Sequence, residues 1–215
     1  MLLINGNKES PPLISLSNKP LEIVPSYKYL GIDINTELDS MEQWHRTQKR
    51  IGPVPYLLKQ LKLNGFREEI LVTVYRSHVL SHIGYGSPVF ISATAAILDE
   101  MERAQTRAFN IIGISEQVAL DKYSIGTVRQ FIEHTCVNTI KRMMANPHHQ
   151  LAEKLAFEPV RETRAAFRFR LPVARTEAYN NSIVPRCVRV LRDGKATLYN
   201  PFTKKMRDAT KRKRD

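Results

Sequence analysis

The sequence predicts an α+β chain in which a small antiparallel sheet precedes a mainly helical body. Three observations support this fold class. Short apolar and aromatic runs, separated by turn residues, occupy residues 1–38. Apolar residues recur at three- and four-residue spacing through residues 39–157. Over residues 158–215 this periodicity fades and basic residues dominate, so we expect a loosely structured end with a disordered tail.

The first region is expected to contain short strands. The runs Leu13–Leu16 and Leu21–Val24 flank a polar stretch and predict a hairpin with a four-residue loop. The segment Tyr27–Asn35 is rich in tyrosine and isoleucine, which fit a pleated, half-buried surface, so it is expected to add one strand. Gly31 inside that strand indicates a bulge or the close approach of another backbone. Strands this short need a partner sheet or helices over one face.

The second region is expected to form helices. Ser40 and Gln43 have capping-box spacing, and Thr94 is placed to cap a later helix. The stretch Ile83–Ile91 contains two glycines and a proline and is expected to be a turn with an extended end. The expected helices cover residues 40–50, 54–63, 67–81, 95–112 and 127–146.

Three segments of the chain carry a family resemblance. They are Tyr27–Asn35, which begins Tyr-Lys-Tyr-Leu-Gly-Ile, then Tyr75–Pro88, which ends Ile-Gly-Tyr-Gly-Ser-Pro, and Leu98–Ala108. In this order and spacing they resemble the C-terminal palm and thumb of reverse transcriptases from non-LTR (LINE-type, jockey-like) retrotransposons. The resemblance covers roughly residues 1–155. It implies that the strands are a palm remnant and that the helices are a thumb-like bundle.

The carboxylates that such an enzyme needs are missing from the sequence. The resemblance implies a two-metal polymerase whose metals are held by an adjacent Asp pair and one earlier Asp. This chain has no adjacent Asp pair, and Asp33, near the palm end, is expected on the solvent face of its strand. His78 and His82 have helical metal-ligand spacing without an evident third ligand. We therefore expect no catalytic residue, metal site or cofactor in this chain, with Mg²⁺ bound only by the full-length enzyme.

Nucleic-acid binding remains as the expected activity. The resemblance places Lys28, Tyr29, Leu30 and Gly31 beside the primer terminus. A lysine neutralises phosphate and a glycine lets a nucleic-acid backbone come close. The alternative is that Tyr27 and Tyr29 belong to the sheet core and that Lys28 is a solvated edge charge. The helices themselves have few cations on any one face.

Positive charge is concentrated at the C-terminal end. Residues 1–158 contain 17 Lys or Arg against 16 Asp or Glu, whereas residues 159–215 contain 16 against 5. An arginine and phenylalanine run is suited to phosphate pairing and base stacking, the alternative being a strand with phenylalanine inward. Its residues are Arg161, Arg164, Phe167, Arg168, Phe169 and Arg170. Val188–Leu191 is expected to be a strand.

The final residues resemble a bipartite nuclear-import signal, with a non-specific electrostatic tail as the alternative. The basic residues concerned are Lys204, Lys205, Lys211, Arg212, Lys213 and Arg214. They predict a nuclear location, or a cytoplasmic one if the tail acts only through its charge. The two cysteines have neither pair-motif nor metal-site spacing, which favours a reducing compartment. No apolar run reaches the length of a membrane span, so we expect no membrane partner.

Together these features predict a fragment of a retrotransposon reverse transcriptase. It would bind RNA or an RNA–DNA hybrid, lack polymerase activity by itself, and have an upstream catalytic polypeptide as a further partner. The alternative is a non-catalytic, retrotransposon-derived helical protein that binds another protein or RNA.

Overall fold

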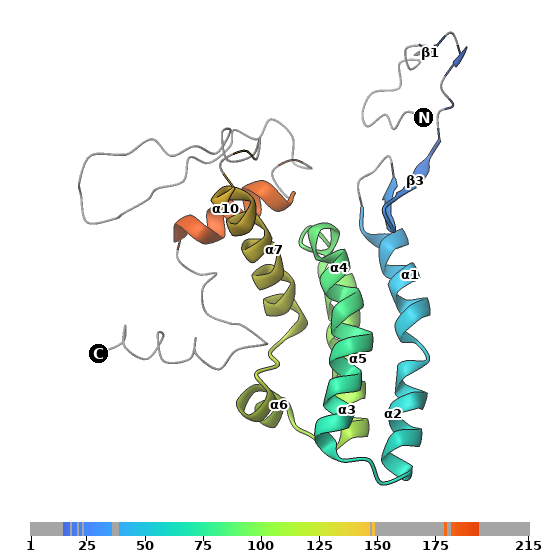
Figure 1. Ribbon diagram of the computed structural model, residues 1–215, viewed down its shortest axis with the longest axis vertical. Helices are drawn as coiled ribbons and strands as arrows, with labels where there is room; N and C mark the ends of the chain where they lie inside the picture. Colours follow the sequence, from blue (N-terminus) through green and yellow to red (C-terminus); the bar gives the residue numbers. More distant parts are fainter. Residues whose placement is uncertain are drawn as a thin grey trace, which may run out of the picture.

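The computed structural model describes residues 15–17, 19, 20, 22, 24–35, 39–146, 148, 179 and 182–193. Within this part, two small antiparallel hairpins precede a body of helices, as the sequence predicts (Figure 1). The helical elements are α1 (Met41–Ile51), α2 (Val54–Leu63), α3 (Glu68–Tyr75), the π-helical turn η1 (Arg76–Leu80), α4 (Ser81–Phe90), α5 (Ala95–Ile112), α6 (Glu116–Tyr123), α7 (Val128–Ala145) and α10 (Ile183–Asp193).

The segment Tyr27–Asn35 is a hairpin, so the prediction of one continuous strand is wrong. Strand β3 (Ser26–Tyr29) pairs with β4 (Ile32–Asn35) across a turn formed by Leu30 and Gly31. Both turn residues have positive φ, 46° and 82°, which is the geometry that matches the twist of paired strands. Leucine rarely takes this conformation, so the sequence gives only half of the usual turn signal.

The first hairpin is tighter than predicted. Strand β1 (Ser15–Leu16) pairs with β2 (Lys19–Pro20), and Leu16 lies opposite Lys19. The loop therefore contains two residues instead of four. Strand β2 therefore falls in the predicted loop, and the expected second strand Leu21–Val24 takes no part in this pairing within the described residues.

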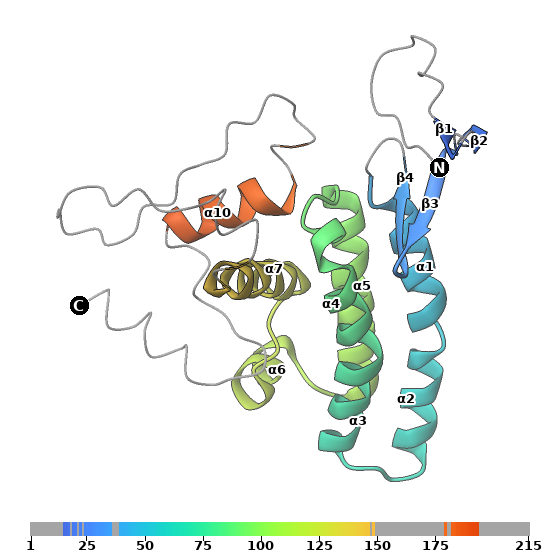
Figure 2. The same ribbon diagram turned by 45° about the horizontal axis from the view of Figure 1, so that its top comes forward.

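Helices α1 and α2 form a rod that bends at Gly52 and Pro53 (Figure 2). The amide of Gly52 still donates to the Gln48 carbonyl at 2.8 Å. Pro53 and Pro55 have no amide proton, so the Lys49 and Ile51 carbonyls lack a partner four residues further on. The bend between two otherwise well-formed helices follows from these two missing donors.

The stretch Ile83–Ile91 is helical as far as Phe90, so its prediction as a turn is wrong. It continues α3 and η1 without interruption into α4. Ile83 and Phe90 of α4 are completely buried, and this packing outweighs the low helix propensity of the two glycines. Pro88 is exposed on the outer side of the helix.

Two further helices are absent from the sequence-based prediction. The first is α6, whose N-terminus is capped by the Ser115 hydroxyl, which accepts the amide of Val118 at 3.2 Å. The second is α10, which replaces the predicted strand Val188–Leu191. Its Cys187 and Val188 are buried, and α10 lies beside α7 in both views (Figures 1 and 2). Periodicity over eleven residues, rather than over four, would have indicated this helix.

The core lies between α1, the continuous rod α3 to α4, α5 and α7. Trp44 meets Phe90 edge-on at 6.3 Å between ring centroids, and Tyr75 meets Phe109 at 5.3 Å. The Tyr75 hydroxyl donates to Gln105 Oε1 at 2.7 Å, so its buried polar end is satisfied. This core holds the β3–β4 hairpin at one end of the helical body.

Candidate nucleic-acid interface

The β3–β4 hairpin presents one aromatic and apolar face. Tyr27 and Tyr29 alternate along β3, and their cross-strand partners are Ile34 and Ile32. These four side chains therefore share one face. Tyr27 is 45% exposed and Tyr29 is 59% exposed, while Leu30 at the turn is 72% exposed. The face is an exposed platform of two phenol rings next to an apolar tip.

The opposite face of the hairpin is anchored to α1. Asp33, directly across from Lys28, is only 8% exposed and forms an ion pair of 2.5 Å with Arg46. The amide of Asp33 donates to Gln43 Oε1 at 3.0 Å. The prediction that Asp33 lies on the solvent face is therefore wrong, because the hairpin turns that carboxylate toward the helix.

The hairpin turn is held by the helical body. The Tyr85 hydroxyl donates a hydrogen bond to the Leu30 carbonyl. A Cβ added to Gly31 would lie 3.5 Å from the Tyr85 ring, in ordinary van der Waals contact. The close neighbour of Gly31 is thus a tyrosine of α4. Its positive φ is the stronger reason for glycine at this position.

The four residues that the resemblance assigns to primer binding are divided by this geometry. Tyr29 is exposed on the aromatic face and Leu30 at its tip. Lys28 is exposed on the opposite face, across from Asp33. Gly31 is half-buried beside Tyr85. The structure adds Tyr27, which lies beside Tyr29. Strand alternation gives this pairing of tyrosines directly, once the turn at Leu30 is known.

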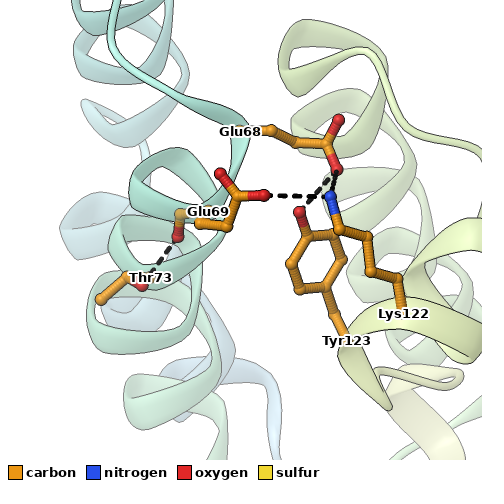
Figure 3. Close-up of polar contacts among 5 residues, drawn as sticks. All are labelled: Glu68, Glu69, Thr73, Lys122 and Tyr123. Atoms are coloured by element: carbon orange, nitrogen blue, oxygen red, sulfur yellow. Dashed lines mark hydrogen bonds and ion pairs between the residues drawn. The ribbon is translucent and has the colours of Figure 1, made fainter.

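A cluster of ionisable groups joins α3 to α6 at the other end of the body (Figure 3). Lys122 donates to Glu68 and Glu69 at 3.1 and 3.0 Å, and Tyr123 donates to Glu68 at 2.5 Å. Hydrogen bonds from Tyr123 and then Lys122 lower the pKa of Glu68. Bonds to Tyr123, Glu69 and Glu68 raise the pKa of Lys122, and burial followed by Glu68 raises that of Tyr123.

These shifts hold Lys122 charged and Tyr123 protonated. Neither group is therefore prepared to act as a base or nucleophile near neutral pH, since both would have to lose a proton. The two glutamates lie in the first turn of α3, where negative charge is favoured. The cluster is a clamp between two helices, supported by the bond from Arg76 to the Tyr123 carbonyl.

The two histidines at metal-ligand spacing are differently placed. His78 is exposed, whereas His82 is half-buried and its pKa is lowered by burial, then by Arg50 and His78. Among the described residues, no three His, Cys, Asp or Glu side chains gather closely enough to hold a metal ion.

Helix α10 brings arginines together that are distant in the sequence. Arg186 and Arg189 of α10 line a cavity of about 480 Å³ together with Arg129 and Glu133 of α7. Arg129 pairs with Asp99 at 2.5 Å, and Arg186 donates to the Ile91 carbonyl. Burial raises the pKa of Glu133, while Arg186 opposes this shift. The sequence alone showed few cations on any one helix face, and here two helices combine them.

The predicted basic sites lie outside the described residues. This holds for the arginine and phenylalanine run at 161–170 and for the tail at 204–214. Within the described part of the chain, no helix combines the length and apolar character needed to cross a bilayer.

Comparisons with known proteins give no relative for this chain. No protein-family model matches it, and neither the curated proteins nor the solved structures include a match.

Proposed function

We propose that this chain is the C-terminal palm-and-thumb part of a non-LTR retrotransposon reverse transcriptase and contributes template–primer binding. The supporting observation is the exposed face of Tyr27 and Tyr29, which lies on the first of the three segments that carry the resemblance. The order of elements, antiparallel hairpins followed by a helical body, also agrees with the proposal.

The physical case is based on base stacking. An exposed aromatic side chain in a nucleic-acid groove contributes about 1–3 kcal/mol for each stacked base and tolerates any base. Tyr27 and Tyr29 are two residues apart on one strand, so their Cα atoms are about 7 Å apart. The Leu30 tip extends the same face. Lys28, exposed on the other face, supplies a flexible charge for phosphate.

The proposal assigns binding and no chemistry. The sequence contains no adjacent Asp pair, and the carboxylate of Asp33 is ion-paired with Arg46. Nucleotide transfer by a two-metal site needs carboxylates that can bind both metals. The primer would therefore be extended by catalytic groups on another polypeptide segment.

Filter binding of the full chain to an RNA–DNA hybrid tests the proposal. Affinity is measured at about 50 and 200 mM salt, beside a peptide of residues 204–214. We expect the full chain to bind much more tightly than the peptide, with a steep loss of affinity at the higher salt. Binding no tighter than that of the peptide would contradict the proposal, because the tail charge would then explain all of it.

A second function is favoured by a different surface. Leu63 at the end of α2 is 78% exposed, and Phe66 and Ile70, which follow it through the turn into α3, are also exposed. Tyr56, 69% exposed, lies two helical turns before Leu63 on α2. Exposed apolar residues gathered in this way are typical of protein-binding sites. A non-catalytic, retrotransposon-derived interaction protein would use this surface. Substituting Leu63→Glu would then abolish partner binding and leave hybrid binding unchanged.

A further inference from the structure

A cavity at the bend between α1 and α2 has the chemistry of a small-ligand site. Its volume is about 420 Å³, within the range of small-molecule pockets. Apolar walls come from Ile51, Val54 and Val79, and α5 supplies Glu100, Arg103 and Arg107. The cavity lies where the prolines bend the rod of α1 and α2 next to α5, so we attribute it to the prolines at the bend.

Glu100 forms the acceptor end of the cavity. Its Oε2 accepts hydrogen bonds from Trp44 Nε1 at 2.6 Å and from Gln48 Nε2 at 3.0 Å. These two donors fix the carboxylate and use both lone pairs of one oxygen. No donor from the described residues reaches Oε1, so two acceptor sites remain for a ligand.

Arg103 and Arg107 form the cationic end. They are one helical turn apart on the same face of α5, and both are exposed. Neither has an ion-pair partner among the residues that the structure describes. Paired guanidinium groups at this spacing suit a phosphate, which each can bind in a bidentate manner. From Glu100 to Arg107 the distance along the helix axis is about 10 Å.

We propose that this cavity binds a guanine nucleotide. The open Oε1 of Glu100 can accept from the adjacent ring and amino N–H donors of guanine together, because these two donors can converge on one acceptor atom. The apolar walls take the flat base, and Arg103 and Arg107 take the phosphate. One nucleotide spans the distance between these ends. This site is separate from the tyrosine face and goes beyond the proposed function, so it stands whether or not the hairpin binds a duplex.

Trp44 provides a direct readout because it is the one tryptophan of the chain and lines the cavity. The full chain is titrated with guanosine, inosine and uridine monophosphates and with ribose 5-phosphate, following Trp44 fluorescence and calorimetric heat. We expect guanosine monophosphate to bind best, inosine monophosphate several-fold more weakly, and ribose 5-phosphate at least tenfold more weakly. Absence of both signals with every ligand would overturn the proposal, and so would equal affinity for all four.

Two variants locate the site. Glu100→Gln can still accept from Trp44 and Gln48, but it turns an amide donor toward the base, so the preference over ribose 5-phosphate should disappear. The double variant Arg103→Glu/Arg107→Glu should lose binding at least tenfold. The matched control Lys141→Glu/Arg142→Glu makes the same charge change on exposed residues of α7 and should bind like the unmodified chain. Equal losses in both double variants would indicate non-specific charge attraction and would overturn the site.

The ligand could be a free nucleotide or a guanosine within a strand. A short single-stranded RNA containing one guanosine is competed against guanosine monophosphate at the same Trp44 signal. Tighter binding of the strand assigns the pocket to RNA, and tighter binding of the monophosphate assigns it to the free nucleotide.

Discussion

Arg46 of α1 and Asp33 of β4 form an ion pair of 2.5 Å that joins the hairpin to the helical body. Asp33 is nearly buried, and Arg46 remains partly exposed. The pair turns one face of the hairpin toward α1 and leaves the tyrosine face outward. The orientation of the candidate interface therefore depends on a contact on the opposite face of the hairpin from the two tyrosines.

Removing the carboxylate should destabilise the chain. Asp33→Ala leaves Arg46 without its partner beside the hairpin, and breaking a largely buried pair costs about 3 kcal/mol. Urea unfolding followed by Trp44 fluorescence measures the loss. The control is Lys28→Ala on the facing strand position, where an exposed side chain should contribute less than about 0.5 kcal/mol. Equal effects of both substitutions would show that the ion pair does not anchor the hairpin.

Substitutions at the two turn residues, Leu30 and Gly31, should have different effects on the free energy of unfolding. Gly31→Ala forces a Cβ into a left-handed conformation and should cost about 1–2 kcal/mol of unfolding free energy. Leu30→Asn should be neutral or stabilising by up to about 1 kcal/mol, because asparagine accepts positive φ more readily. The bond from Tyr85 uses the Leu30 backbone and is retained in both variants. Chemical denaturation of the Gly31→Ala and Leu30→Asn variants measures both effects. A stabilising effect of Gly31→Ala would contradict the left-handed conformation of Gly31 in the turn.

Two glycines of α4 should respond differently to alanine. A Cβ on Gly86 would lie 2.4 Å from the buried Phe90 ring, whereas one on Gly84 would lie 3.2 Å from Phe131. Gly86→Ala should therefore cost about 1–3 kcal/mol through overpacking. In Gly84→Ala, the gain in helix propensity of about 0.5–1 kcal/mol offsets a smaller steric cost. Thermal unfolding of the two variants gives the comparison, and equal stability would argue against a helical α4.

Stability should fall on mild acidification because of His134. Burial, followed by Lys141, lowers its pKa below the ordinary value of 6.5. The unfolded chain then binds a proton near pH 6.5 while the folded chain does not. The contribution of neutral His134 to the free energy of unfolding is fully present above this pH. It is lost as the pH falls from about 6.5 towards the lower pKa of the folded chain. His134→Gln should reduce this slope between about pH 7 and 5. Part of it should remain, because His82 is shifted in the same direction.

The chain has two cysteines, Cys136 of α7 and Cys187 of α10, and both are buried. The hydrogen bond with Cys187 and burial raise the pKa of the Cys136 thiol, which makes its reactive thiolate rarer. We expect an aromatic disulfide reagent to react with neither thiol in the native chain and with both in denaturant. Rapid native reaction of either thiol would show that α10 does not pack on α7.

The sequence predicted the elements whose signals are local. Asn64 and Gly65 follow α2 where the sequence predicts its end, and α7 begins at the predicted Thr127. The predicted caps Ser40 and Thr94 form no side-chain cap hydrogen bond, so those two predictions are wrong. It missed features that depend on distant packing. The helix through Gly84 and Gly86 forms because Ile83 and Phe90 are buried between other helices. The turn at Leu30 is supported by Tyr85, which is 55 residues away.

The candidate site was predicted only in part for the same reason. Tyr29 and Leu30, which the resemblance assigns to binding, are exposed, and Tyr27, which was assigned only to the alternative core role, is exposed as well. Lys28 and Tyr29 point to opposite faces because neighbours in a strand alternate. Asp33 pairs with Arg46, and no local pattern in the sequence joins those two residues.

The most direct measurement of the central claim is the affinity of the Tyr27→Ala/Tyr29→Ala variant for an RNA–DNA hybrid. The control is Tyr56→Ala, which removes an exposed tyrosine from α2, away from the hairpin. Loss of two stacking contacts predicts at least about tenfold weaker binding for the hairpin variant and unchanged binding for the control. Equal affinity of both variants and the unmodified chain would contradict a nucleic-acid interface on the β3–β4 hairpin.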